Sequence, residues 1–220
     1  MVYHDRRDAG RRLGARLREL GVEADLVLGV PRGGMPVALE VADVLGSPLD
    51  VVVVRRIVAD LGAGTTVTVG AVGESGARFV DDELVQQIGV TGDELAALER
   101  IEALEVAHQV HRFRGDRARS ELRGRHVVVV DDLVTSGSSV RAACRIARRL
   151  GAAQVTVAVP VVPEPWAEHI ADDVERVVAL EQVPHEPTAG RVYANAVVVD
   201  DEAVVSCLQA AARAAELRAH

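Results

Sequence analysis

The most informative segment of the chain is His126-Val-Val-Val-Val-Asp-Asp-Leu-Val-Thr-Ser-Gly-Ser-Ser-Val140. Its four consecutive valines lack the polar alternation of a half-exposed strand, so they predict a strand that is buried on both faces. Two adjacent carboxylates, Asp131 and Asp132, end this strand. The small residues that follow open into Ser138–Leu150, whose apolar residues have helical spacing. A buried strand that leads through a short loop into a helix is typical of a parallel-sheet α/β protein.

Further buried strands and amphipathic helices are expected on both sides of this segment. Short apolar runs that end near Pro, Gly or Asp predict strands at Asp25–Val30, Asp50–Val54, Val67–Val72, Arg78–Val80, Gln154–Val159, Glu175–Leu180 and Ala196–Val199. Helical spacing of apolar residues predicts helices at Asp5–Leu20, Pro36–Leu45, Asp93–Arg112, Pro165–Ala171 and Asp201–Leu217. The valine run of Asp50–Val54 favours a central place in the sheet, whereas the glycine-containing stretch Ile57–Thr66 is expected to be weakly structured.

Strands that alternate with helices predict the α/β class, with a Rossmann-like parallel sheet whose strand C-terminal ends share one edge. No internal repeat or low-complexity linker divides the chain. We therefore expect one domain over residues 1–220, with a core of roughly residues 20–180 and a small accessory lobe from residues 1–19 and 181–220.

Composition limits the function classes. With 49% hydrophobic residues, the chain of 220 residues is long enough to bury a sizeable core. The net charge of −8 disfavours nucleic acid as a general partner, since such binding needs a basic face. All 25 basic residues are arginine, so any side-chain cation that meets a phosphate group is a guanidinium.

Nothing in the sequence indicates a membrane or secreted protein. Residues Met1–Asp8 lack the apolar core of a signal peptide, and no apolar run is long enough to span a bilayer. Cys144 and Cys207 lie in apolar helical patterns without metal-ligand spacing, so they are expected to be small buried side chains. A reducing cytoplasm fits these features best.

The loop between strand and helix, Thr135–Ser139, is suited to hold a phosphate group. Small residues let backbone N–H groups converge on an anion, and the helix N-terminus adds its partial positive charge. Asp131 and Asp132 repel each other, so ribose hydroxyls or a divalent cation such as Mg2+ would stabilise them. The structural alternative is a strand that ends at an Asp turn, with a serine cap on the next helix. A Walker-type nucleotide loop is excluded because the Gly-Lys-Ser/Thr element is absent.

A second glycine loop follows the first predicted strand, in Val30-Pro-Arg-Gly-Gly-Met-Pro-Val-Ala38. Gly33 and Gly34 allow a close approach to an anion, and Arg32 can hold that anion with its guanidinium group. An ordinary turn with an exposed arginine is the alternative for this segment taken alone.

Together these segments resemble a known family. Val127–Ser139 is similar, at nearly every position, to the phosphoribosyl pyrophosphate (PRPP) signature of type I phosphoribosyltransferases. The likeness to a bacterial subgroup of predicted phosphoribosyltransferases covers most of the chain. It is carried by Asp5-Arg6-x-x-Ala9-Gly10, Pro31–Ala38, Val54-Arg55-Arg56 and Gly70-Ala71-Val72.

The resemblance implies a type I phosphoribosyltransferase fold in which the accessory lobe is the hood. It implies an enzyme that moves the 5-phosphoribosyl group from PRPP to a nucleobase-like acceptor, with Mg2+ as cofactor, pyrophosphate as product and a homodimer as assembly. Asp131 and Asp132 would bind the ribose and the metal, and they would act in catalysis together with Arg56. The other implied substrate-binding residues are Pro31, Arg32, Gly33, Gly34 and Arg55 at the pyrophosphate and Thr135, Ser136, Gly137, Ser138 and Ser139 at the 5-phosphate.

Some positions depart from the family pattern. The stretch Val58–Thr66 lacks the Pro/Gly/Asn-rich composition usual over the active site, which favours an alternative: a non-catalytic regulator that binds PRPP or a nucleotide. Thr135 stands where enzymes acting on 6-oxopurines usually carry an acid, so it argues against that class. A magnesium-dependent phosphatase or hydrolase is a third possibility, against which the loop after the acid pair argues.

Four further interpretations concern individual side chains. Glu74, in a Gly-Glu-Ser-Gly turn, is interpreted as a solvated acid rather than an acceptor contact. Tyr193 is the nearest candidate to stack on an acceptor base in the expected acceptor segment His185–Ala194, and Trp166 is expected to pack. The arginines of Asp5–Leu20 are interpreted as a solvated helix face.

Overall fold

The computed structural model describes residues 3–135, 137–164, 166, 170 and 173–219. Its central element is a parallel sheet of five strands in the order β2-β1-β6-β7-β8. The strands are β1 (Leu26–Gly29), β2 (Leu49–Val51), β6 (His126–Val130), β7 (Gln154–Pro163) and β8 (Arg176–Val183). The parallel-sheet α/β prediction is therefore confirmed, with β6 at its centre.

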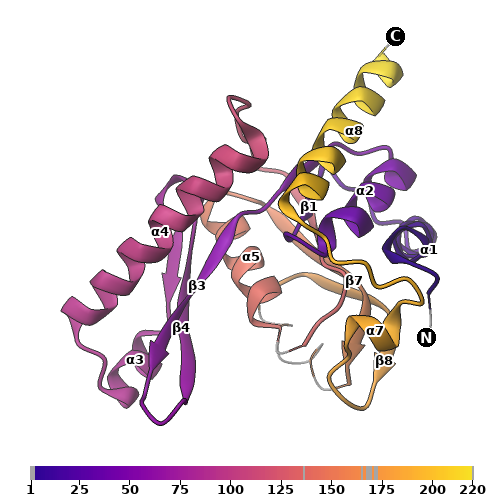
Figure 1. Ribbon diagram of the computed structural model, residues 1–220. Helices are drawn as coiled ribbons and strands as arrows, with labels where there is room; N and C mark the ends of the chain where they lie inside the picture. Colours follow the sequence, from indigo (N-terminus) through magenta and orange to yellow (C-terminus); the bar gives the residue numbers. More distant parts are fainter. Residues whose placement is uncertain (1–2, 136, 165, 167–169, 171–172, 220) are drawn as a thin grey trace.

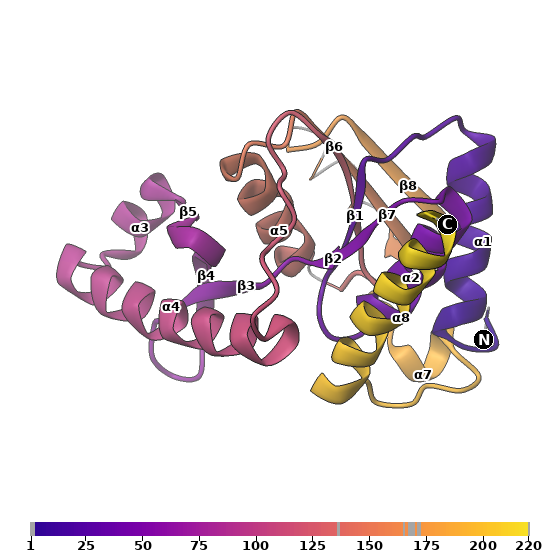
Figure 2. The same ribbon diagram turned by 90° about the horizontal axis from the view of Figure 1, so that it is seen from above.

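Helices cover both faces of the parallel sheet. The helices α1 (Arg6–Glu19), α2 (Gly34–Leu45) and α8 (Asp201–Ala219) lie on one side, and α5 (Ser138–Arg149) lies on the other (Figures 1 and 2). Successive valines of β6 join different clusters of the core: Val128 and Val130 pack with α1 and α2, whereas Val127 and Val129 pack with α5. All four of these valines are fully buried, as the absence of polar alternation predicted.

A second sheet stands beside the first and is antiparallel. It contains β3 (Val54–Asp60), β4 (Thr66–Gly73) and β5 (Arg78–Val80), with the short 3-10 helix η1 (Glu74–Gly76) between β4 and β5. The helices α3 (Asp82–Ile88) and α4 (Gly92–Arg114) follow, and α4 runs along the hairpin (Figure 1). The α4 helix begins at a capping box in which Thr91 and Glu94 bond each other's backbone N–H groups.

Two expectations for this part of the chain were wrong. Asp50–Val54 is not a central strand: β2 is an edge strand, Val52 and Val53 form a buried connection, and Val54 begins the second sheet. The residues Ile57–Thr66 are not weakly structured either, because β3 pairs with β4 from Val54 to Asp60. Glycines and small residues were misleading here, since the turn that needs positive φ occupies only Gly62–Gly64.

The start of the described chain meets a late segment near the sheet. Tyr3 pairs with Tyr193, and the short helix α7 (Ala189–Val192) precedes this contact. The predicted strand Ala196–Val199 was wrong: its residues are irregular, and Val198 is 86% exposed. The helix predicted at Pro165–Ala171 lies largely outside the described residues, although Trp166 is buried, as expected for a packing residue. No helix in the described parts of the chain is long and apolar enough to cross a membrane.

Candidate functional site

The site is built where the chain changes direction across the sheet. β1 and β6 are neighbours, but β1 leads through α2 to β2 on one side and β6 leads through α5 to β7 on the other. The loops after β1 and β6 therefore leave the same sheet edge and open a crevice, which is the usual ligand position in such sheets. The described residues of both segments singled out in the sequence, Val30–Ala38 and Asp131–Ser139, lie at this point.

The acid pair is held by local bonds and by one distant arginine. The Asp131 carboxylate accepts a bond from the backbone N–H of Asp132 at 2.8 Å. The Nε of Arg6 donates to Oδ2 of Asp132 at 2.8 Å, and both side chains are almost buried, at 12% and 13% exposure. Burial raises the pKa of Asp131 well above its usual range, and the nearby charge of Asp132 raises it further. A bound cation or hydroxyl donors would stabilise the ionised form of these two carboxylates.

The two glycines of the first loop lie directly against this acid pair. A Cβ atom on Gly33 would lie 2.4 Å from Oδ2 of Asp132, and one on Gly34 would lie 2.7 Å from the carbonyl oxygen of Val130. Any side chain at either position would collide with the acid-bearing strand end, so glycine is required for the close approach. The Pro31–Arg32 peptide bond of this loop is cis.

The predicted cationic residues gather around one cavity of about 260 Å3. Pro31, Arg32, Arg55, Arg56 and Ser139 line it, together with residues of α4 that include Glu102. The Nη1 of Arg56 donates to Oγ of Ser138 at 2.8 Å, so the second sheet contacts the start of α5. Arg55 instead pairs with Glu102 at 2.8 Å.

The connection between β6 and α5 depends on a glycine. Gly137 has φ of 75° and precedes α5 as its N-cap residue, and as a glycine it has no side chain to cap the first N–H groups of that helix. A Cβ on Gly137 would lie 1.5 Å from Nε1 of Trp166, because the indole packs on the loop. Thr135 is exposed to solvent, and Ser136 lies outside the described residues. The loop thus leaves backbone donors available to an anion.

Sequence reasoning missed two charged residues of this region. Arg6 was interpreted as part of a solvated helix face, but it lies over the Tyr193 ring and bonds Asp132. Asp201, in the first turn of α8, pairs with Arg32 at 2.5 Å and with Arg112 at 3.0 Å. The only signal for Arg6 was its place in a family-like motif, and an acid in a first helical turn gave no signal at all.

Two interpretations of single side chains were wrong. Tyr193 is 1% exposed, and its hydroxyl donates to the carbonyl oxygen of Asp132, so its ring is not free to stack on an acceptor base. Glu74 is not a solvated turn acid: it is 7% exposed and paired with Arg114. In both cases a long-range polar contact, invisible in local sequence, determines the position of the side chain.

Comparison with known proteins gives the family. The family model described as phosphoribosyl transferase domain matches residues 3–188. The chain belongs to this family. This membership confirms the resemblance that the two loop motifs suggested, and it agrees with the way the fold brings both loops to one crevice.

Relatives extend the family assignment over nearly the whole chain. A protein of Mycobacterium tuberculosis (strain ATCC 25618 / H37Rv), provisionally named phosphoribosyl transferase Rv0571c, is 39% identical over 212 residues, which cover 96% of this chain and 47% of the relative. The amidophosphoribosyltransferase of the same strain is 26% identical over 202 residues, or 91% of this chain and 28% of the relative. The chain thus spans about half the length, or less, of these curated relatives.

A solved structure shares the whole fold. The crystal structure of TT1426 from Thermus thermophilus has a TM-score of 0.84 and 36% sequence identity, and the match covers 94% of this chain and 98% of that one. The fold described above is therefore shared with that protein.

Proposed function

We propose that this chain transfers the 5-phosphoribosyl group from PRPP to a nucleobase-like nitrogen acceptor and releases pyrophosphate. The observation that carries the proposal is the contact of Gly33 and Gly34 with the strand end that bears Asp131 and Asp132. The loop that would bind the pyrophosphate group thus lies beside the acid pair that would bind the ribose ring, as a substrate with both groups requires. The match of the phosphoribosyl transferase domain over residues 3–188 supports it.

Each part of the crevice suits one part of PRPP. Asp131 and Asp132 would accept hydrogen bonds from the ribose hydroxyls. The segment Thr135–Ser139 would hold the 5-phosphate with backbone N–H groups at the start of α5. Arg32, with Arg55 and Arg56 across the cavity of about 260 Å3, would stabilise the charge that develops on the leaving pyrophosphate. Positioning then accounts for most of the rate.

The acid pair also fits a magnesium ion. Within the described residues no three His, Cys, Asp or Glu side chains form a ligand group, so two carboxylates would have to share the ion with substrate oxygens. Mg2+ is commonly bound in this way, and when bound it would neutralise charge on the pyrophosphate. Arg6 holds Oδ2 of Asp132 and would fix the direction in which the carboxylate presents its other oxygen.

The alternative function, a non-catalytic regulator that binds PRPP or a nucleotide, is not favoured. It relied on the unusual composition of Val58–Thr66, which the structure places in the regular β3–β4 hairpin rather than in a defective loop. The acceptor, a homodimeric assembly and a cytoplasmic location stay predictions. The two free, buried cysteines are compatible with a reducing compartment.

The test is a pyrophosphate-release assay with PRPP, Mg2+ and a panel of purine and pyrimidine bases. Release with one acceptor, and its loss in Asp132→Asn, would support the transferase. The exposed Asp116→Asn is the matched control, since this residue lies outside the crevice. Tight PRPP binding without release for any base would favour the regulator, and no PRPP binding would refute the proposal.

A further inference from the structure

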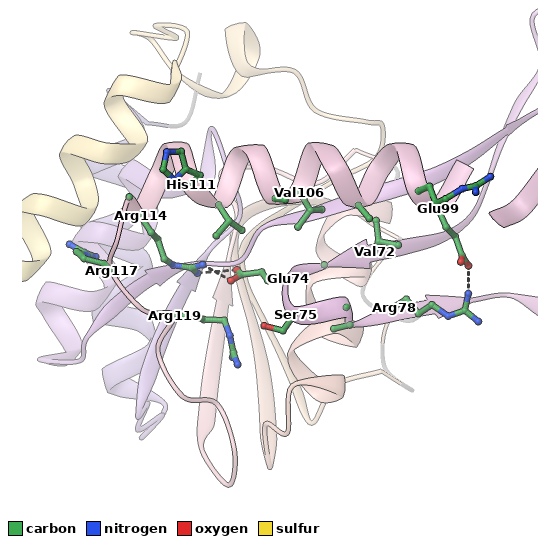
Figure 3. A pocket seen from close by; sticks show the side chains of 18 of the residues that line it. Val72, Glu74, Ser75, Arg78, Glu99, Val106, His111, Arg114, Arg117 and Arg119 are labelled. Atoms are coloured by element: carbon green, nitrogen blue, oxygen red, sulfur yellow. Dashed lines mark hydrogen bonds and ion pairs between the residues drawn. The ribbon is translucent and has the colours of Figure 1, made fainter. Parts of the chain in front are cut away.

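A second, larger cleft lies on another face of α4, away from the arginine cavity. Its volume is about 810 Å3, within the range of small-molecule pockets. One wall is α4, and the other is formed by the end of β4, η1 and the start of β5 (Figure 3). The segment Gly115–Arg119, which follows α4, closes one end. None of the residues assigned to PRPP lines this cleft.

The walls of the cleft are mainly aliphatic. Val72 and Val106 are buried at its base, at 6% and 3% exposure, while Ala103 and Ala107 are exposed along the same helical face. Small side chains on α4 leave room between the helix and the hairpin, so the alanines make a trough. Apart from charged groups and His111, Ser75 is the one lining residue with a polar side chain. The uncharged part of the lining is therefore almost entirely apolar.

The polar floor of the cleft is already satisfied. Nη2 of Arg114 donates to Glu74 at 3.0 Å, and Nε of Arg114 donates to Asp50 at 2.8 Å. Within the described parts of the chain, no buried side-chain nitrogen or oxygen lacks a hydrogen-bond partner. The buried polar side chains at the floor therefore already have hydrogen-bond partners within the protein. A polar group of the ligand would have to bind to other residues of the cleft.

The charge of the cleft is unequal along its length. Five arginines and two glutamates line it, an excess of three positive charges in a chain of net charge −8. At one end Arg78 pairs with Glu99, and Arg100, the next residue of α4, leaves one excess positive charge there. Arg117 and Arg119 lie at the opposite end, beside Arg114 (Figure 3), and neither forms an ion pair with a described carboxylate. Two of the three excess positive charges, on Arg117 and Arg119, therefore lie at the end of the aliphatic trough beside Arg114.

We infer that this cleft binds an aliphatic carboxylate, with its tail along the α4 alanines and its head at Arg117 and Arg119. The unpaired arginines favour a ligand with a negative charge, and the aliphatic walls favour a ligand with a hydrocarbon chain. Guanidinium groups bind carboxylates well, and burial of each methylene group in such a trough strengthens binding about fourfold. The inference is independent of the transferase reaction.

Calorimetry with three probes tests separately whether the ligand needs a negative head group and whether it needs a long hydrocarbon tail. Decanoate has both tail and head, butyrate has the head with a short tail, and decyltrimethylammonium has the tail with the opposite charge. We expect decanoate to bind at one site per chain, butyrate to bind at least about 100-fold more weakly, and the ammonium compound not to bind. Equal binding of decanoate and the ammonium compound would overturn the inference.

Variants place the binding in this cleft. Ala107→Trp should fill the trough and abolish decanoate binding, whereas Ala215→Trp, at an exposed alanine of α8, should not. Arg117→Gln combined with Arg119→Gln should weaken binding at least about tenfold, with exposed Arg213→Gln as the charge control. Circular dichroism checks that each variant is folded.

Two results would contradict the inference. One is decanoate binding that is unchanged in both Ala107→Trp and the double arginine variant. The other is a concentration-dependent dimer that Ala107→Trp abolishes, because the trough would then be an interface between two copies of this chain.

Discussion

Arg114→Met is expected to destabilise the protein by about 3–5 kcal/mol, because it leaves two carboxylates buried without their cation. The Arg114 side chain is 1% exposed, and those of Asp50 and Glu74 are 4% and 6% exposed. The guanidinium bonds both carboxylates and also donates to the carbonyl oxygen of Val51 at 2.5 Å. It thereby joins β2 of the parallel sheet, η1 at the end of β4 and the helix α4, which packs on the second sheet.

The size of the expected loss in unfolding free energy follows from the burial of these charges rather than from the number of hydrogen bonds. Burial by itself lowers the pKa of Arg114, but the bond to Glu74 and the charges of Asp50 and Glu74 outweigh it and raise this pKa. The cation is therefore strongly coupled to its partners. Arg12 forms a more exposed ion pair with Asp8, with side chains 56% and 21% exposed. The substitution Arg12→Met should therefore lower the free energy of unfolding by only about 0–1 kcal/mol. The contrast between Arg114→Met and Arg12→Met separates buried from surface ion pairing.

The assay is urea unfolding followed by circular dichroism, with the free energy extrapolated to water. Glu74→Gln should cost less than Arg114→Met, about 1–3 kcal/mol, because the amide keeps an acceptor of the same shape. If Arg114→Met lost less than about 1 kcal/mol with an unchanged m-value, the buried cluster would not stabilise the fold and the reasoning would be refuted.

Three other perturbations have definite outcomes. Gly33→Ala should weaken PRPP binding at least about tenfold in calorimetry, because its Cβ would lie 2.4 Å from Oδ2 of Asp132. Asp131→Asn should raise the melting temperature of the ligand-free protein at pH 7 but abolish magnesium-dependent PRPP binding. The direction of this change in stability follows from the pKa of Asp131, which is higher in the folded protein than in the unfolded chain. The carboxyl group therefore contributes its full stability below about pH 3.9, its unfolded pKa, and loses this contribution as the pH rises through its folded pKa. Cys144 and Cys207 should resist a thiol reagent in the native state and react on unfolding, since burial raises the pKa of both thiols.

Each of these outcomes has a contrary result. Unchanged PRPP affinity in Gly33→Ala would mean that the loop does not position Asp132. A lower melting temperature for Asp131→Asn at pH 7 would mean that the charged carboxylate stabilises the apo protein. Rapid labelling of native protein, measured by absorbance of the released thiolate, would show that at least one cysteine is accessible.

The sequence predicted the parts of the fold that depend on local pattern. The valines of His126–Val130 have no polar alternation, and a strand buried on both faces follows from that alone. The glycines at Gly33, Gly34 and Gly137 were also informative, since a missing side chain marks a close backbone approach.

Long-range pairing could not be predicted in the same way. The run Asp50–Val54 is equally apolar whether it continues one sheet or crosses between two, so its edge position was missed. The burial of Glu74 depends on Arg114, which lies forty residues away in the chain. Arg6 has the same polar composition around it as its solvated neighbours, and only the fold brings it 2.8 Å from Asp132.

The position of Arg6 has a consequence for synthesis of the protein. Arg6 is translated well before the groups that hold it: Asp132 supplies a carboxylate, Tyr193 a ring and Val197 a carbonyl oxygen at 2.7 Å. A nascent chain that has completed β6 therefore still lacks part of the environment of its acid pair. Ribosome-bound chains that end before Val197 should not yet bind PRPP, although their central strands have already emerged.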